Sequence, residues 1–303
     1  MRGVFIDAND SLAEIFERQR QAGDPPVRVH LNPNITPEQW PEILDGAEIG
    51  IVDHTALPTD VARQCKGLKH VVFLGTGARS YMNPEELAEL GITVHLIKGY
   101  GDTAVAEAAI ALMWASARGL AQMDREMRAG NWLRDDGMQL TGKTLGLIGF
   151  GGIAAEVARI ASGSGMKVIA WNRTPKSHQG VTFVNLDELL ATSHVVSLHL
   201  LLNDETRGFL SRERIAQMRP GVILVNTARG AVVDEAAMIE ALRSGHIRHA
   251  GLDVFNIEPL PNDHVLTTIP NVTLSAHSAF RTPEASENLI HAAWEHCRRV
   301  ALG

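Results

Sequence analysis

Residues 144–155 read Thr-Leu-Gly-Leu-Ile-Gly-Phe-Gly-Gly-Ile-Ala-Ala. Gly149, Gly151 and Ala154 occupy the small positions of the pattern G-x-G-x-x-G/A, after an apolar strand and at the start of a helix. In dinucleotide-binding folds these positions permit a tight turn, the approach of a pyrophosphate to the backbone, and close packing of helix on strand. A plain glycine-rich turn is the alternative. The flanking strand and helix, and a second strand that ends at Trp171, favour a dinucleotide site.

The choice of cofactor depends on the residues that come after this motif. Gly152 and Ile153 lie in the first turn of the expected helix, where free backbone N–H groups are suited to binding phosphates. Where NAD-binding proteins carry an acid for the ribose hydroxyls, this chain reads Asn172-Arg173-Thr174 and has no acid. Arg173 would meet a 2′-phosphate, so we expect NADP to be preferred over NAD, with NAD as a second cofactor. A solvated surface arginine is the alternative.

Outward from the motif, short apolar runs alternate with helix-length segments along most of the chain. The expected strands lie at residues 4–7, 27–31, 49–52, 71–74 and 93–96 and, from the glycine motif onward, at 144–149, 167–171, 194–198, 222–226, 249–252 and 272–275. Strands that alternate with helices predict βαβ units and a parallel sheet. We therefore expect one small α/β sheet domain in the first hundred residues and a second after residue 143.

Two segments have the character of long helices. Residues 103–118 (TAVAEAAIALMWASAR) are apolar nearly all round and lack glycine and proline, so this helix should be buried between layers, domains or subunits. Residues 283–302 carry Glu284 early and Arg299 late, which matches the helix dipole.

Composition excludes several classes of protein. The chain has 303 residues and a net charge of −7, with 45% hydrophobic and 21% charged residues, which are ordinary values for a globular protein of two domains. The chain has no block of basic residues that would predict nucleic-acid binding. Its longest apolar runs are much shorter than the roughly 18 residues of a membrane span. The two cysteines, Cys65 and Cys297, form no CxxC pair, so we expect no cysteine metal site and a location in the reducing cytoplasm.

Three later segments bring together residues suited to catalysis. They are 222–235 (VILVNTARGAVVDE), 249–261 (HAGLDVFNIEPLP) and 270–282 (PNVTLSAHSAFRT). Arg229 and His277 each come just after an expected strand, and ligands of parallel sheets collect outside the carboxyl ends of strands. One crevice would therefore hold both. Taken singly, each is explained as well by a structural role, since His277 is one of 13 histidines.

At this point the sequence resembles the D-isomer-specific 2-hydroxyacid dehydrogenase family over nearly its whole length. The shared motifs are Val105-Ala106-Glu107, Leu140-x-Gly142-Lys143-Thr144, Gly149-Phe-Gly151-Gly-Ile153, His199, Glu205-Thr206-Arg207, Asn226-Thr-Ala-Arg229-Gly230, Gly251-Leu-Asp253-Val-Phe255, Glu258-Pro259 and His277 with Thr282. The chain departs from the family pattern at Ala154, Asn172, Leu201 and Ala276. Only Asn172 bears on function, because it affects the choice of cofactor.

The resemblance implies a role for each site residue. Arg229, Glu258 and His277 match the catalytic set, in which the histidine gives a proton, the glutamate orients it, and the arginine holds the substrate carboxylate and carbonyl. The resemblance also implies that Thr227, Ala228 and Asp253 bind the cofactor, Asp253 at its nicotinamide end, and that the loop Leu74-Gly75-Thr76-Gly77 binds the substrate carboxylate through backbone N–H groups. A tight turn in which glycine serves geometry alone is the alternative for this loop.

The resemblance further implies two doubly wound parallel-sheet domains. Residues 1–98 and 280–303 would form a flavodoxin-like substrate domain and residues 99–279 a Rossmann domain, with the active site in the cleft and a homodimer formed through 103–118 and the segment after it. The expected reaction transfers a hydride between the cofactor and a small 2-oxo or D-2-hydroxy acid; glyoxylate, hydroxypyruvate, phenylpyruvate and a phosphorylated acid all remain open. A nucleotide-sensing, corepressor-like protein is the rival, and a metal enzyme a weaker one, because no ligand spacing is present.

Overall fold

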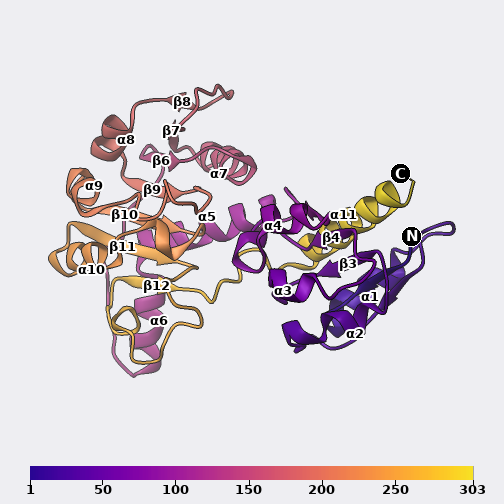
Figure 1. Ribbon diagram of the computed structural model, residues 1–303. Coiled ribbons are helices and arrows are strands. Elements are labelled where there is room, and N and C mark those ends of the chain that lie inside the picture. Colours follow the sequence, from indigo (N-terminus) through magenta and orange to yellow (C-terminus); the bar gives the residue numbers. More distant parts are fainter. Residues whose placement is uncertain (303) are drawn as a thin grey trace. The chain divides into compact units, whose positions relative to one another are not determined.

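The computed structural model describes residues 1–302 and divides into two compact units. The first combines Met1–Gly101 with the chain from Arg281 onward, and the second is Asp102–Phe280. These borders lie within three residues of the expected domain ranges, while the ligand that each unit binds stays a prediction. Both units are parallel α/β sheets, so the expected fold class is confirmed (Figure 1).

The first unit holds a five-stranded parallel sheet of order β2-β1-β3-β4-β5, the flavodoxin-like order. Its strands are β1 (Gly3–Phe5), β2 (Val27–Val29), β3 (Ile49–Val52), β4 (His70–Phe73) and β5 (Thr93–Leu96). Its helices are α1 (Asp10–Arg18), α2 (Trp40–Leu44), α3 (Thr59–Ala62), α4 (Pro84–Glu89) and α11 (Pro283–Leu302), with 3₁₀ turns at Pro37–Gln39 and Ala78–Ser80.

Helix α11 belongs to the core of the first unit although it is distant in sequence. Figure 1 shows it in yellow among the indigo and purple elements. The fully buried Trp294 stacks on Phe16 of α1 with ring centroids 4.2 Å apart, and its Nε1–H donates to the Phe16 carbonyl at 3.0 Å. Ile290 is also fully buried in this cluster. The α11 side chains therefore complete the hydrophobic core of the first sheet.

The second unit holds a seven-stranded parallel sheet of order β12-β11-β10-β9-β6-β7-β8. Its strands are β6 (Thr144–Ile148), β7 (Lys167–Trp171), β8 (Thr182–Phe183), β9 (Val195–Leu198), β10 (Val222–Asn226), β11 (Ile247–Leu252) and β12 (Val272–Leu274). Its helices are α5 (Asp102–Arg118), α6 (Leu120–Arg128), α7 (Gly152–Gly163), α8 (Leu186–Thr192), α9 (Arg212–Gln217) and α10 (Glu235–Ser244), with 3₁₀ turns at Gly230–Val232 and Val265–Thr267. Counted from β6, this is the Rossmann order with one further strand at the β12 edge.

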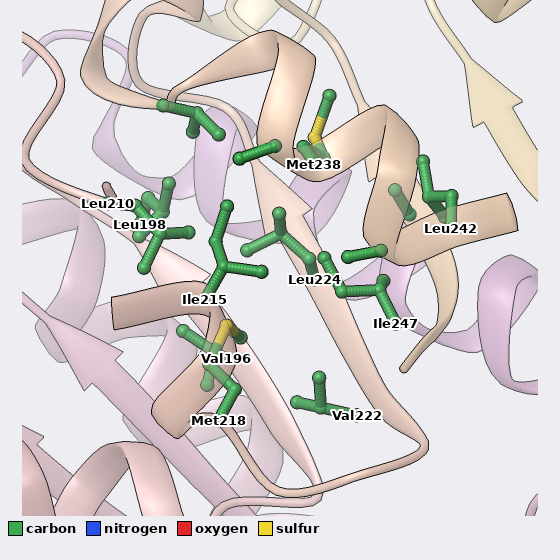
Figure 2. Packing of buried hydrophobic residues seen from close by; sticks show 14 of the residues in the cluster. Val196, Leu198, Leu210, Ile215, Met218, Val222, Leu224, Met238, Leu242 and Ile247 are labelled. Carbon is green, nitrogen blue, oxygen red and sulfur yellow. The ribbon is translucent and has the colours of Figure 1, made fainter. Parts of the chain in front are cut away.

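Both faces of the second sheet are buried. Leu224 of β10 points toward α9 and α10 in the cluster of Figure 2, whereas its neighbours Ile223 and Val225 belong to the cluster on the opposite face. Successive strand residues point to opposite faces, so a strand buried on both sides is a continuous apolar run. That is why residues 222–225 are readable as a strand from the sequence.

Helix α5 lies within the second unit and is partly buried there; its apolar composition had predicted burial between layers, domains or subunits. Its buried side chains include Ala109, Leu112 and Met113. A Cβ on Gly251 of β11 would meet Leu112 and Ser116 at 3.0 Å, so the glycine allows this helix to pack directly on the sheet. Within residues 1–302 no single helix is long and apolar enough to cross a membrane; α5 and α6 meet that test only as a pair bent by 64°.

Candidate active site

The glycine motif forms the turn between β6 and α7. Gly149 has a φ of +85°, and a Cβ there would lie 2.6 Å from the carbonyl oxygen of His199. A Cβ on Gly151, the N-cap of α7, would meet nothing within 4 Å, so the space before this helix is open. Ala154 is fully buried in the core under α7. The three small residues thus have different roles. Gly149 allows the tight turn, Gly151 leaves space before the helix, and Ala154 packs in the core.

Asp102, which sequence reasoning missed, lies against the same helix terminus. A Cβ on Gly152, the first residue of α7, would stand 1.8 Å from Asp102 Oδ2. Burial and the nearby Glu156 carboxylate raise the pKa of Asp102. No sequence pattern indicated this residue, because it begins α5, fifty positions before Gly152. A carboxylate here is attracted by the positive end of α7, where we expect phosphates to bind.

Replacing Asp102 with Asn is expected to tighten dinucleotide binding about two- to fivefold, because a carboxylate at a helix N-terminus contributes about 0.3–1 kcal/mol and competes with a phosphate there. The measurement is the Kd of NADPH and of NADH by isothermal titration calorimetry. Glu156→Gln is the control, since this carboxylate lies on α7 itself and pairs with Arg159. An unchanged or weaker affinity in Asp102→Asn would show that the carboxylate does not compete with the cofactor.

The turn after β7 is held by its own side chains. Asn172 Oδ1 accepts a hydrogen bond from the Phe150 N–H at 3.0 Å, and Asn172 Nδ2 donates to the carbonyl and hydroxyl of Thr174 at 2.8 and 3.0 Å. Arg173 is exposed and forms an ion pair with Glu205. Lys176, which sequence reasoning did not single out, donates to the Phe150 carbonyl at 2.6 Å. Two cations therefore lie in one turn beside the glycine motif.

A second stretch expected to contact the cofactor follows β10. The Thr227 hydroxyl is buried and has no hydrogen-bond partner among residues 1–302. Next to it, the Asn226 side chain accepts from the Ala228 N–H and donates to the Arg229 carbonyl, both at 3.0 Å, which fixes the turn. A buried hydroxyl without a partner is costly unless a ligand satisfies it. Together with the open space before Gly151, it shows that this chain's residues fit a dinucleotide cofactor.

The side chain of Arg229, which extends from this turn, is half-buried. Its Nη1 donates to the Ala228 carbonyl at 2.7 Å, and no carboxylate within residues 1–302 forms an ion pair with it. A Cβ on the next residue, Gly230, would lie 2.1 Å from the carbonyl carbon of Phe255. Only glycine lets the turn that carries Arg229 approach the segment after β11 so closely. The remaining donors of the guanidinium are suited to a carboxylate ligand.

Glu258 and His277 form a pair. His277 Nδ1 lies 2.6 Å from Glu258 Oε2, and the other oxygen of Glu258 accepts the Phe255 N–H at 2.8 Å. Because a carboxylate only accepts hydrogen bonds, Nδ1 of His277 is the donor and Nε2 is left for a ligand. The two side chains are 36% and 33% exposed, so the pair is reachable from solvent.

Asp253 organises the loop that carries His277. The Asp253 carboxylate is buried and accepts hydrogen bonds from the Ser275 hydroxyl at 2.5 Å and from the N–H groups of Ser278 and Ala279 at 3.0 Å. His277 itself has a φ of +47°, in the left-handed region, and its N–H donates to the Asp253 carbonyl at 2.8 Å. Such a conformation costs about 1–3 kcal/mol and persists where neighbours enforce it. The resemblance assigned Asp253 to the cofactor; all the contacts described for its carboxylate are to this loop.

In the first unit, the loop Leu74–Gly77 follows β4 directly. The Leu74 N–H donates to the Val52 carbonyl and the Gly75 N–H to the Phe73 carbonyl, each at 2.8 Å. Within residues 1–302, no backbone hydrogen bond is donated by the N–H groups of Thr76 and Gly77. Two donors at the carboxyl end of a parallel strand are thus left for a ligand.

A Rossmann-type sheet, a glycine turn open before its helix, and a basic turn after the second strand define a dinucleotide-binding α/β protein. The family described as "D-isomer specific 2-hydroxyacid dehydrogenase, NAD binding domain" matches residues 110–279, more than half of the chain. The chain belongs to the D-isomer specific 2-hydroxyacid dehydrogenase family, which confirms the resemblance found in the sequence. It is accordingly a nicotinamide-dependent oxidoreductase of 2-hydroxy and 2-oxo acids.

Individual relatives show how far the similarity extends. Hydroxypyruvate reductase of Thermotoga maritima is 40% identical over 241 residues, which cover 78% of this chain and 78% of that protein. Glyoxylate reductase of Aeropyrum pernix is 37% identical over 257 residues, covering 80% and 76% of the two chains. The solved structure of the acyclic imino acid reductase Bsp5 in complex with NADPH and D-Arg is 28% identical, with a TM-score of 0.86 over 100% of this chain and 97% of that one. Within residues 1–302 no group of three or more His, Cys, Asp or Glu side chains is arranged to hold a metal ion.

Proposed function

We propose that the chain reduces a small 2-oxo acid to the D-2-hydroxy acid, with His277 as proton donor, Glu258 as its partner and Arg229 as the ligand of the substrate carboxylate and carbonyl. The observation that carries the proposal is the 2.6 Å contact between His277 Nδ1 and Glu258 Oε2. The pair follows β11 and β12, beside the turn after β10 that bears Arg229, so all three lie at the carboxyl edge of one sheet.

The chemistry requires a hydride, a proton and a positive group, and the nicotinamide cofactor supplies the hydride when bound. As the carbonyl of the 2-oxo acid becomes an alkoxide, His277 Nε2 gives it a proton. Glu258 accepts a hydrogen bond from Nδ1, which sets the ring orientation and leaves Nε2 for the transfer. In the reverse direction the same nitrogen accepts the proton.

Arg229 would bind the carboxylate and the carbonyl oxygen together. Its fork of donors matches two oxygens at fixed spacing, and no carboxylate of the described chain neutralises it. In the first unit, the N–H groups of Thr76 and Gly77 donate no backbone hydrogen bond within the described chain and would also be suited to binding a carboxylate.

We further propose that NADP is preferred over NAD. A carboxylate at the end of β7 would repel a 2′-phosphate, and this chain has Asn172 there, followed by the exposed Arg173 and the hydroxyl of Thr174. The Bsp5 relative was solved with NADPH. Replacing Arg173 with Ala is expected to lower kcat/KM for NADPH about fivefold to tenfold and to leave NADH unchanged, because an exposed charge-assisted contact contributes about 1–1.5 kcal/mol. Equal efficiencies of the two cofactors in the wild-type protein would contradict the preference.

One experiment tests the proposed reaction. Glyoxylate, hydroxypyruvate, phenylpyruvate and a phosphorylated 2-oxo acid are each offered with NADPH and with NADH, and oxidation of the cofactor is followed at 340 nm. Chiral analysis of the product should give the D isomer. Tight cofactor binding without turnover on any of these acids would instead favour a nucleotide-sensing, corepressor-like role on the same fold.

The proposal extends to assembly as a homodimer. Leu120 and Met127 of α6 and Trp132 beyond it are large apolar side chains that are 52%, 51% and 74% exposed. They lie in the segment after α5, through which the resemblance implies dimerisation. Apolar side chains gathered in one segment are typical of surfaces that pair with a second copy. Light scattering coupled to size exclusion should give twice the 32.9 kDa chain mass.

A further inference from the structure

We propose that Phe150 is the anchor of the 2′-phosphate site, that Lys176 binds this phosphate more strongly than Arg173 does, and that Asn172 only positions the turn. The proposal rests on the preference for NADP proposed above and names the residues that produce it. We call Phe150, Asn172 and Lys176 the Phe150 clamp.

The clamp holds the backbone of Phe150 on both sides, through the peptide that precedes this residue and the peptide that follows it. The N–H of Phe150 donates to Asn172 Oδ1 at 3.0 Å, and its carbonyl accepts from Lys176 Nζ at 2.6 Å. Phe150 stands between Gly149 and Gly151, the two glycines of the turn that approaches the pyrophosphate. The turn after β7 is thereby attached to the residue at the centre of the glycine motif.

The ring of Phe150 strengthens this attachment. It is buried and packs edge-on against Phe183 of β8 with centroids 5.1 Å apart, and the His178 ring lies 5.2 Å away. Aromatic pairs in this geometry contribute beyond the area they bury. The exposed segment between Asn172 and Phe183 is therefore fixed at both its ends and near its middle by a single residue of the glycine motif.

Asn172 uses both of its donors within the turn, and of its acceptor capacity it keeps one lone pair of Oδ1. Its oxygen takes the Phe150 N–H, and its amide nitrogen donates to both the carbonyl and the hydroxyl of Thr174. Aspartate could replace the acceptor but not the two donors, so the clamp explains why an amide stands at a position where NAD-binding proteins have an acid. Asn172 is accordingly a positioning residue.

Asn172 is uncharged, and Lys176 supplies a positive charge for the phosphate in the same turn. Its ammonium has three donors, of which the Phe150 carbonyl uses one, and no carboxylate within residues 1–302 pairs with it. Arg173, by contrast, is already paired with Glu205. A cation fixed by a buried residue loses less freedom on binding phosphate than one that must first leave a carboxylate. Of the two, Lys176 is therefore the stronger ligand.

The test uses fragments of the cofactor, so that binding is measured without turnover. Titration calorimetry gives the Kd of 2′,5′-ADP and of 5′-AMP, which differ only in the 2′-phosphate. Lys176→Met is expected to weaken 2′,5′-ADP about tenfold or more and 5′-AMP less than about twofold. Lys167→Met is the matched control, because it removes the same charge at the opposite end of β7. Equal weakening of both fragments, or of neither, would overturn the role of Lys176.

The positioning role of Asn172 has its own measurement, hydrogen exchange at the Phe150 amide. Asn172→Ala removes the acceptor and should speed this exchange, whereas Asn172→Asp keeps the acceptor and should leave it slow. Both variants should lose affinity for 2′,5′-ADP, because both lose the bonds to Thr174. Slow exchange in Asn172→Ala would mean that the clamp does not hold the peptide.

The two proposals fail in different ways. If the wild-type protein binds 5′-AMP as tightly as 2′,5′-ADP, the preference for NADP is wrong, and the clamp proposal is overturned with it. If the wild-type protein prefers 2′,5′-ADP and Lys176→Met keeps that preference, the choice of NADP stands and the assignment of Lys176 is wrong.

Discussion

Replacing His277 with Gln should lower kcat for reduction of the best 2-oxo acid by about 10²–10⁴, the usual contribution of a positioned acid or base. Glutamine keeps a polar side chain of similar reach but cannot carry the proton that His277 Nε2 gives to the alkoxide. The Kd of the cofactor should stay within about twofold, because the glycine turn and the turn after β7 belong to other segments of the chain. Single-turnover kinetics with saturating substrate measure the effect.

The control for this variant is His291→Gln, which removes an exposed imidazole from α11 of the first unit. Its kcat should be unchanged. The left-handed conformation at His277 makes a folding check necessary, so the thermal midpoint of both variants should be recorded. Near-wild-type kcat in a folded His277→Gln protein, with chemistry rate-limiting, would remove His277 from the mechanism.

Replacing Arg229 with Lys should reduce kcat/KM by about 10–10²-fold, since a hydrogen bond to a charged group contributes about 1.5–3 kcal/mol and lysine keeps the charge but loses the fork. Because the guanidinium would bind both the ground state and the transition state, KM should rise and kcat should fall together. Initial rates over a range of substrate concentrations separate the two constants.

Arg248→Lys provides the matched change, because this arginine lies on β11 and donates to the Asp136 carbonyl. Its kinetic constants should equal those of the wild type. If Arg229→Lys also left both constants unchanged, the carboxylate would have to be bound elsewhere, and the free N–H groups of Thr76 and Gly77 would be the remaining candidates.

The sheets could be predicted because their central strands, such as β3, β9 and β10, are buried on both faces. Residues 222–225 read as an uninterrupted apolar run, and the structure has β10 at Val222–Asn226. The two-residue β8 and the helix α6 were not predicted. β8 is too short to show a period. The helix α6 does carry Leu120, Met123 and Met127 at helical spacing, a signal that could have indicated it.

The site residues also fall into those that the apolar pattern of the strands could indicate and those that it could not. Arg229 and His277 could be proposed because both follow apolar strands, whose carboxyl ends meet at one edge of the sheet. Asp102 and Lys176 could not, because each acts through a contact with a distant segment, Gly152 in one case and Phe150 in the other. From the sequence, Asn172 was expected to affect the choice of cofactor; its hydrogen bonds show in addition that it holds the turn after β7 to Phe150 and Thr174.

The return of α11 to the first unit constrains the order of events during synthesis. The second unit is one continuous segment, so all its strands are available once residue 280 has been translated. Ile290 and Trp294 of the core of the first unit are made only after the whole second unit. The first unit can therefore complete its core only after the segment that forms the second unit has been synthesised, whereas domains are generally expected to fold in order from the N-terminus. Until α11 is released, Phe16 lacks its stacked aromatic partner, Trp294.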